Sequence, residues 1–114
     1  MKVVINVDWG GFGISEACAR RMAELGDTDA KNMIDEYERR KTSATEFESD
    51  RYWYCYWSGK RDNPVLIRAV KELGAKSWGT YAKLKVVNIP DGTEYEIDDY
   101  DGRESIHEKH RSWD

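Results

Sequence analysis

The stretch VVINVDWGGFGISEAC, residues 3–18, organises the rest of the chain. Its β-branched first half predicts a short strand. Three glycines then interrupt the pattern: Gly10, Gly11 and Gly13. A helical pattern begins at Ser15, so backbone N–H groups and the positive end of a helix dipole would point to one place, where a phosphate could bind. The stretch matches neither the GxGxxG fingerprint nor a Walker A loop, and a tight strand-to-helix connection explains the glycines at least as well.

Composition indicates one globular domain covering residues 1–114. The chain is 39% hydrophobic, 35% charged and 12% aromatic, which is polar but too aromatic for a disordered chain. A net charge of −4 argues against a broad basic face, so we expect no direct nucleic-acid binding. No apolar run is long enough for a membrane span and no signal peptide is apparent, so we expect a cytoplasmic protein. Cys18 and Cys55 are too few for a disulfide framework.

Three helices are predicted. The first covers residues 15–25, with Gly26 closing it. The second begins at the capping residues 27–29 and reaches about Lys41. The third has Asp62 or Asn63 as its cap, Pro64 in the first turn and an end at Gly74.

Further strands are predicted over residues 51–57, 84–89, 93–100 and 104–110, the last being an alternating run that could instead form a helix. The fold class is therefore α+β, with a mixed or mostly antiparallel sheet of about five strands and two or three helices packed on one face. The strand over 51–57, RYWYCYW, is aromatic on both faces. It is either a covered central strand or one whose face, including Trp53, lines a pocket or a protein interface.

The ionisable residues contain no clear catalytic group. Five acidic residues gather on the penultimate strand and the turn after it: Glu94, Glu96, Asp98, Asp99 and Asp101. Their mutual repulsion favours a solvated face over a catalytic carboxylate pair. His107 and His110 would lie on opposite faces of a strand, so no metal site is expected. Cys18 lies on the inner stripe of the first helix, which favours packing over nucleophilic catalysis.

Four segments carry a resemblance to a known family: GGFGIS (residues 10–15), RDNPVL (61–66), LKVVNIPDG (84–92) and YEIDDYDGRE…EKHRSW (95–113). Together they resemble a family of small phage and prophage proteins, known mainly as uncharacterised reading frames, with an N-terminal GGFG(L/I)S motif and a C-terminal YDGxE…HRxW motif. The likeness covers the two ends and the central helix, about two thirds of the chain. Ser105 departs from it, since an aromatic residue is usual there, and the spacer over 27–50 is long for the family.

The resemblance implies a phage-borne accessory protein in the host cytosol that counters a host defence, and it names no reaction. The residues on its motif positions are Gly10, Gly11, Phe12, Gly13, Ser15, Arg61, Pro64, Tyr100, Asp101, Gly102, Glu104, His110, Arg111 and Trp113.

Two hypotheses of different classes follow. In the first, a non-enzymatic protein captures a small anionic ligand, for example a nucleotide-like one. The amides of residues 11–13 would hold its phosphate, Arg61 and Arg111 would neutralise it, and an indole would stack on its base: Trp9, Trp53 or Trp113. In the second, the acidic strand face with Glu94, Glu96, Asp98 and Asp99 binds a host nuclease or CRISPR effector. Neither hypothesis needs a cofactor, and a homodimer is conceivable in both.

Overall fold

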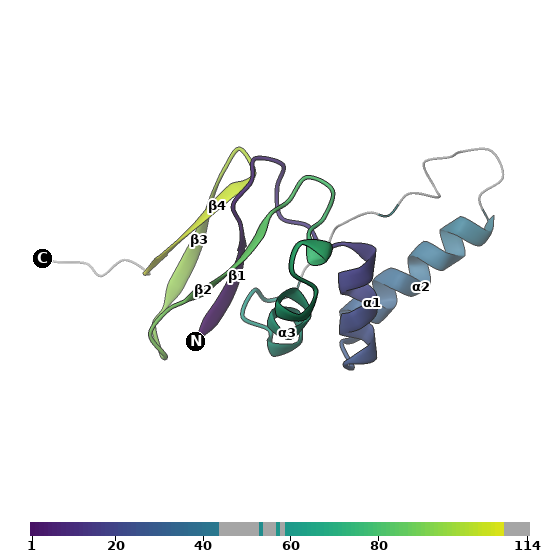
Figure 1. Ribbon diagram of the computed structural model, residues 1–114, viewed down its shortest axis with the longest axis horizontal. Coiled ribbons are helices and arrows are strands. Elements are labelled where there is room, and N and C mark those ends of the chain that lie inside the picture. Colours follow the sequence, from purple (N-terminus) through teal and green to yellow (C-terminus); the bar gives the residue numbers. More distant parts are fainter. Residues whose placement is uncertain (44–52, 54–56, 58, 109–114) are drawn as a thin grey trace, which may run out of the picture.

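The computed structural model describes residues 1–43, 53, 57 and 59–108. The elements follow in chain order: β1 (Lys2–Asn6), α1 (Glu16–Glu24), α2 (Thr28–Ser43), α3 (Pro64–Leu73), the short 3-10 helix η2 (Gly74–Ser77), β2 (Leu84–Asn88), β3 (Tyr95–Tyr100) and β4 (Arg103–Glu108). The β1–β2 pair lies in the middle of the molecule, with the β3–β4 hairpin on one side and the helices on the other (Figure 1).

The three predicted helices are confirmed, and the predicted capping and stop residues lie at the ends of α1 and α3. The Ser15 hydroxyl accepts a hydrogen bond from the Cys18 amide at the start of α1, and Gly26 follows the helix with a φ of 99°. At the start of α3, the Asn63 side chain accepts from the Val65 amide at 2.8 Å, and Pro64 occupies the first turn. Local capping chemistry therefore determines where these helices begin.

The α+β class is confirmed, but the prediction of one sheet of about five strands is wrong. Within the described residues, β1 pairs only with β2 and β3 only with β4, each pair antiparallel. The predicted strand over 51–57 lies largely outside the described residues, and its two described members, Trp53 and Trp57, are not in a strand. Two small sheets thus replace the single one.

The free edge of β1 explains why the two sheets stay separate. The Val4 amide donates to the Arg61 carbonyl oxygen at 2.9 Å, and the Asn6 amide donates to the Glu104 carboxylate at 2.8 Å. The outward-facing donors of this strand are therefore satisfied by a loop carbonyl and a side chain. Because β4 presents a carboxylate to this edge and not its backbone, it does not extend the β1–β2 sheet.

The last strand is confirmed as a strand over Arg103–Glu108, while His110 lies outside the described residues. Tyr100 pairs with Arg103 across a two-residue turn made by Asp101 and Gly102. Both turn residues have positive φ angles, 51° and 88°. This is the geometry of the type I′ turn that an Asp-Gly pair predicts.

The main core lies between the β1–β2 pair and the helices. Val4 and Leu84 contribute from the strands, Met22 from α1 and Leu66 from α3. Val3 and Ile5 are also buried, and because side chains alternate along a strand they face the β3–β4 hairpin. β1 is thus covered on both faces, which fits its nearly continuous apolar sequence.

Candidate functional site

Three turns meet at one end of the molecule. A Cβ built on Gly102 would lie 2.4 Å from the Trp9 carbonyl oxygen and 2.5 Å from the Gly11 amide nitrogen. One built on Gly10 would lie 2.1 Å from the Tyr81 Cβ. Backbones can approach this closely only where side chains are absent. We call this region, formed by residues 9–11, 81 and 100–102, the turn junction.

The turn junction carries the most exposed large apolar side chains of the described residues. Trp9, Tyr81 and Tyr100 are 55%, 74% and 75% exposed. The Trp9 and Tyr100 rings contact each other edge to face, with centroids 6.1 Å apart, and the Arg103 guanidinium lies 5.6 Å from the centre of the Trp9 ring. Exposed aromatic side chains in such a group are typical of interaction surfaces. The structure therefore brings together Trp9, Gly10, Gly11, Tyr100 and Asp101, all predicted site residues.

Arg61 and Glu104 also lie together, as partners of each other. Two guanidinium nitrogens of Arg61 lie 2.6 and 2.8 Å from the two Glu104 carboxylate oxygens, and Glu104 is only 6% exposed. The Arg61 guanidinium also stacks on the Phe12 ring at 3.5 Å from its centroid. The positive charge that sequence analysis assigned to an anionic ligand is thus already balanced inside the protein.

Asn6 completes this buried network, and sequence analysis missed it. Its side-chain amide donates to the carbonyl oxygens of Asp8 and Gly102, at 2.7 and 2.6 Å. Its side-chain oxygen accepts from the amides of Asp8 and Lys83, at 3.2 and 2.9 Å. One buried side chain thus ties β1 to the hairpin turn and to the segment before β2. A single amide in the apolar run VVINV is the signal that could have revealed it.

The second half of the glycine-rich turn joins the segment that follows α3. The Ser15 amide donates to the Ser77 carbonyl oxygen at 2.9 Å, and the Gly79 amide donates to the Gly13 carbonyl oxygen at 3.0 Å. The Ser15 hydroxyl donates in turn to the Lys76 carbonyl oxygen. Within the described part of the chain, the amides of residues 11–13 have no acceptor. The amides predicted to hold a phosphate are therefore not bonded to other groups of the described residues.

The remaining predicted stacking and charged residues lie elsewhere. Trp53 packs against the core, donates from its indole nitrogen to the Ile14 carbonyl oxygen at 3.0 Å, and contacts the Tyr37 ring edge to face. The Trp53 ring is therefore engaged in contacts within the protein. His110, Arg111 and Trp113 lie outside the described residues.

The predicted acidic surface lies on the outer face of the β3–β4 hairpin. Glu94, Glu96 and Asp98 are exposed, and the last two alternate along β3 with the half-buried Ile97. Tyr100 extends the same face to the turn junction. We call Glu94, Glu96, Asp98 and Tyr100 the acidic hairpin face. Asp99 points to the opposite face, where its carboxylate accepts from the Gly102 amide at 2.8 Å and supports the turn.

Cys18 is buried, and loss of hydration raises the pKa of its thiol to about 12, so it packs as an apolar side chain. Among the described residues, no three His, Cys, Asp or Glu side chains are grouped so that they could hold a metal ion. None of the described helices combines the length and apolar character that crossing a bilayer requires.

Comparison of the chain with protein-family models, with curated proteins and with solved structures gives no match.

Proposed function

We propose that this protein is a binding protein that recognises a basic protein surface through the acidic hairpin face and the aromatic side chains of the turn junction. The observation that carries the proposal is the position of Trp9 and Tyr100. Both are more than half exposed, they contact each other, and they lie at the end of a row of exposed carboxylates. Tyr81 is a third exposed ring at the same junction.

The two kinds of side chain would act differently. Aromatic side chains bury a large area with few rotatable bonds and are frequent energetic hot spots in interfaces. Carboxylates at the rim, here Glu96 and Asp98, accelerate the encounter with a basic partner and select against acidic ones. The net charge of −4 adds to this attraction.

The partner that fits this chemistry is a protein with a basic groove. Nucleic-acid-cleaving enzymes carry such grooves because they must neutralise phosphates. Together with the resemblance to phage proteins, this makes a host nuclease or CRISPR effector the proposed target, and counteracting a host defence the proposed role.

The test is a capture experiment from bacterial host lysate with tagged protein. We expect one dominant partner, which is lost in the reversal variant Glu96→Lys/Asp98→Lys and in the truncation variant Trp9→Ala/Tyr100→Ala. The matched control is Asp35→Lys/Glu36→Lys, which reverses the same number of charges on α2 and should retain the partner. Equal capture by all four proteins would refute the proposal.

A small anionic ligand at the glycine-rich turn is the second candidate function. It is supported by the unbonded amides of residues 11–13 and by the exposed Trp9 ring beside them. A thermal-shift screen of linear and cyclic nucleotides tests it, because a ligand that binds the folded state raises the melting temperature. A panel in which no nucleotide changes the melting temperature would argue against this candidate.

A further inference from the structure

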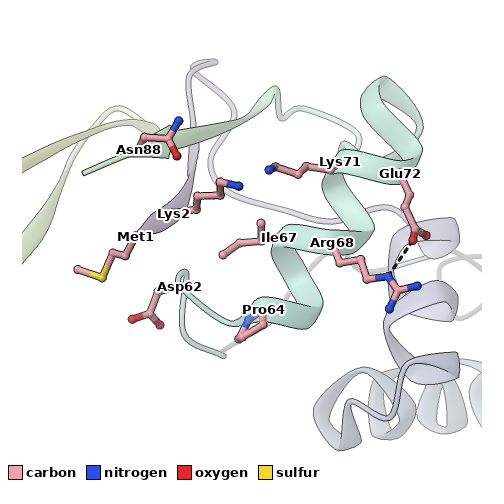
Figure 2. Close-up of a pocket in the computed structure, with 9 residues that line it drawn as sticks. All are labelled: Met1, Lys2, Asp62, Pro64, Ile67, Arg68, Lys71, Glu72 and Asn88. Carbon is pink, nitrogen blue, oxygen red and sulfur yellow. Dashed lines mark hydrogen bonds and ion pairs between the residues drawn. The ribbon is translucent and has the colours of Figure 1, made fainter. Parts of the chain in front are cut away.

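A second binding site lies away from the turn junction, in a cavity of about 610 Å³ beside α3. Its walls come from α3, from the start of β1 and from the end of β2 (Figure 2). The volume lies within the range of about 300–1,000 Å³ that is usual for small-molecule sites. Pro64, Ile67 and the Met1 side chain supply an apolar wall.

Two lysines meet at this cavity. The side chains of Lys2, from β1, and Lys71, from α3, point toward each other in Figure 2. The neighbouring Lys2 ammonium lowers the pKa of Lys71, and partial loss of water acts in the same direction. Two adjacent ammonium groups repel each other, and an anion that bridges them would remove that repulsion.

The carboxylates that border the cavity are engaged elsewhere. Glu72 accepts from Arg21 at 2.7 Å and from Arg68 at 2.9 Å, and these two guanidinium groups lower its pKa to about 2. Asp62 interacts with Tyr95; burial first, and the Asp62 charge second, raise the pKa of that phenol. Within residues 1–43, 53, 57 and 59–108, neither Lys2 nor Lys71 forms an ion pair. The ion pairs of the described residues therefore leave the Lys2 and Lys71 ammonium groups without a carboxylate partner.

We propose that this cavity binds an organic phosphate monoester, with the phosphate bridging Lys2 and Lys71 and the organic part on the Ile67 and Pro64 side chains. A phosphate monoester carries a charge close to −2 at neutral pH and has three strong acceptor oxygens, so it can bond both ammonium groups at once. A carboxylate would compensate only one of the two charges. The apolar wall distinguishes an ester with a hydrophobic body from free phosphate.

The site is independent of the proposed protein-binding surface. Trp9 and Tyr100 do not line it, and the acidic residues of the hairpin face do not border it. A variant that abolishes one kind of binding should leave the other unchanged, so the two proposals can fail separately.

The test uses phenyl phosphate as the probe, with inorganic phosphate and benzyl alcohol as separate arms, followed by amide chemical shifts at constant low salt. We expect phenyl phosphate to shift the amides of Ile67 and Lys71, inorganic phosphate to bind more weakly, and benzyl alcohol to leave the spectrum unchanged. Inorganic phosphate binding as tightly as phenyl phosphate would overturn the assignment of an organic ester. Shifts confined to residues away from the cavity, or no shifts with phenyl phosphate, would overturn the site.

Three single-residue variants test whether phenyl phosphate binds at this specific site or is attracted to the charged surface in general. Lys2→Gln and Lys71→Gln should each weaken phenyl phosphate binding about tenfold, which is the usual effect of losing one charge-assisted hydrogen bond. Lys85→Gln removes an equal charge from a position on β2 that is exposed like Lys2 and Lys71 but does not line the cavity, and it should change the affinity less than twofold. Equal effects of all three substitutions would refute the bridging geometry. Ligand binding should also raise the pKa of Lys71, measured by lysine side-chain NMR.

Discussion

Removal of the Glu104 carboxylate should destabilise the protein more than removal of any surface charge. In Glu104→Ala, the Arg61 guanidinium loses both of its short contacts and the Asn6 amide loses its acceptor, inside a region where Glu104 is only 6% exposed. Breaking a buried pair from one side costs about 3–5 kcal/mol, because a charge remains without compensation. The Arg61 side chain is 21% exposed, so partial hydration places the expected loss near the lower end, about 3 kcal/mol.

The assay is reversible urea or thermal unfolding. At about 3–6 °C per kcal/mol for a domain of this size, the melting temperature should fall by roughly 10–20 °C. Glu104→Gln keeps one oxygen acceptor for the Asn6 amide and should lower the free energy of unfolding by about half as much as Glu104→Ala. It therefore provides a measurement if the alanine variant does not fold. The control is Glu24→Gln, which breaks an exposed pair with Arg21 and should cost about 0.5 kcal/mol or less. If Glu104→Ala is no more destabilising than this control, the edge of β1 does not depend on the ion pair and the reasoning is wrong.

Three further predictions concern single positions. Gly102→Ala should lower the free energy of unfolding by at least about 2 kcal/mol, since its Cβ would meet the Trp9 carbonyl oxygen. Gly92→Ala, at a similar φ of 79° but with open space around it, should lower it by about 1 kcal/mol. Equal losses of the two variants in denaturant unfolding would contradict the close approach. In a Cys55→Ser background, the Cys18 thiol should resist a thiol reagent at mild alkaline pH and react only on unfolding, because burial raises its pKa to about 12. The pKa of Glu72 is held at about 2 against an ordinary 4.5, so Glu72 contributes stability that is present above pH 4.5 and lost as the pH falls toward 2. Glu72→Gln should flatten that part of the curve of unfolding free energy against pH. An unchanged curve would contradict the lowered pKa of Glu72.

The parts of the fold that depend on neighbouring residues could be predicted from the sequence. The caps Ser15 and Asn63 and the stop residues Gly26 and Gly74 define α1 and α3 within a few positions along the chain, and the Asp-Gly pair fixes the hairpin turn in the same way. Each of these signals acts over one to four residues, so the sequence displays it directly.

The division into two sheets could not be predicted, because it depends on contacts between distant residues. Alternation indicates that residues 104–108 form a strand, but not whether its partner is β1 or β3. The answer depends on Glu104 reaching the Asn6 amide, 98 positions away. The role of Arg61 in the candidate site could not be predicted for the same reason. Its sequence neighbours are compatible with ligand binding, and only its ion pair with Glu104, 43 positions away, shows that its charge is balanced inside the protein.

The pairing of β1 with β2 has a consequence for how the protein is made. The strand Lys2–Asn6 is synthesised early, but the strand that pairs with it, Leu84–Asn88, is synthesised much later. Glu104, which accepts a hydrogen bond from the Asn6 amide at the other edge of β1, is synthesised later still. This apolar segment therefore lacks its strand partner, with its backbone groups bonded to water, until the later part of the described chain has been synthesised. During that interval the helices α1 and α3, whose contacts are closer in sequence, can form first and shield Val4 from other nascent chains. In this protein, the central strand is synthesised long before the segments that contact its two edges.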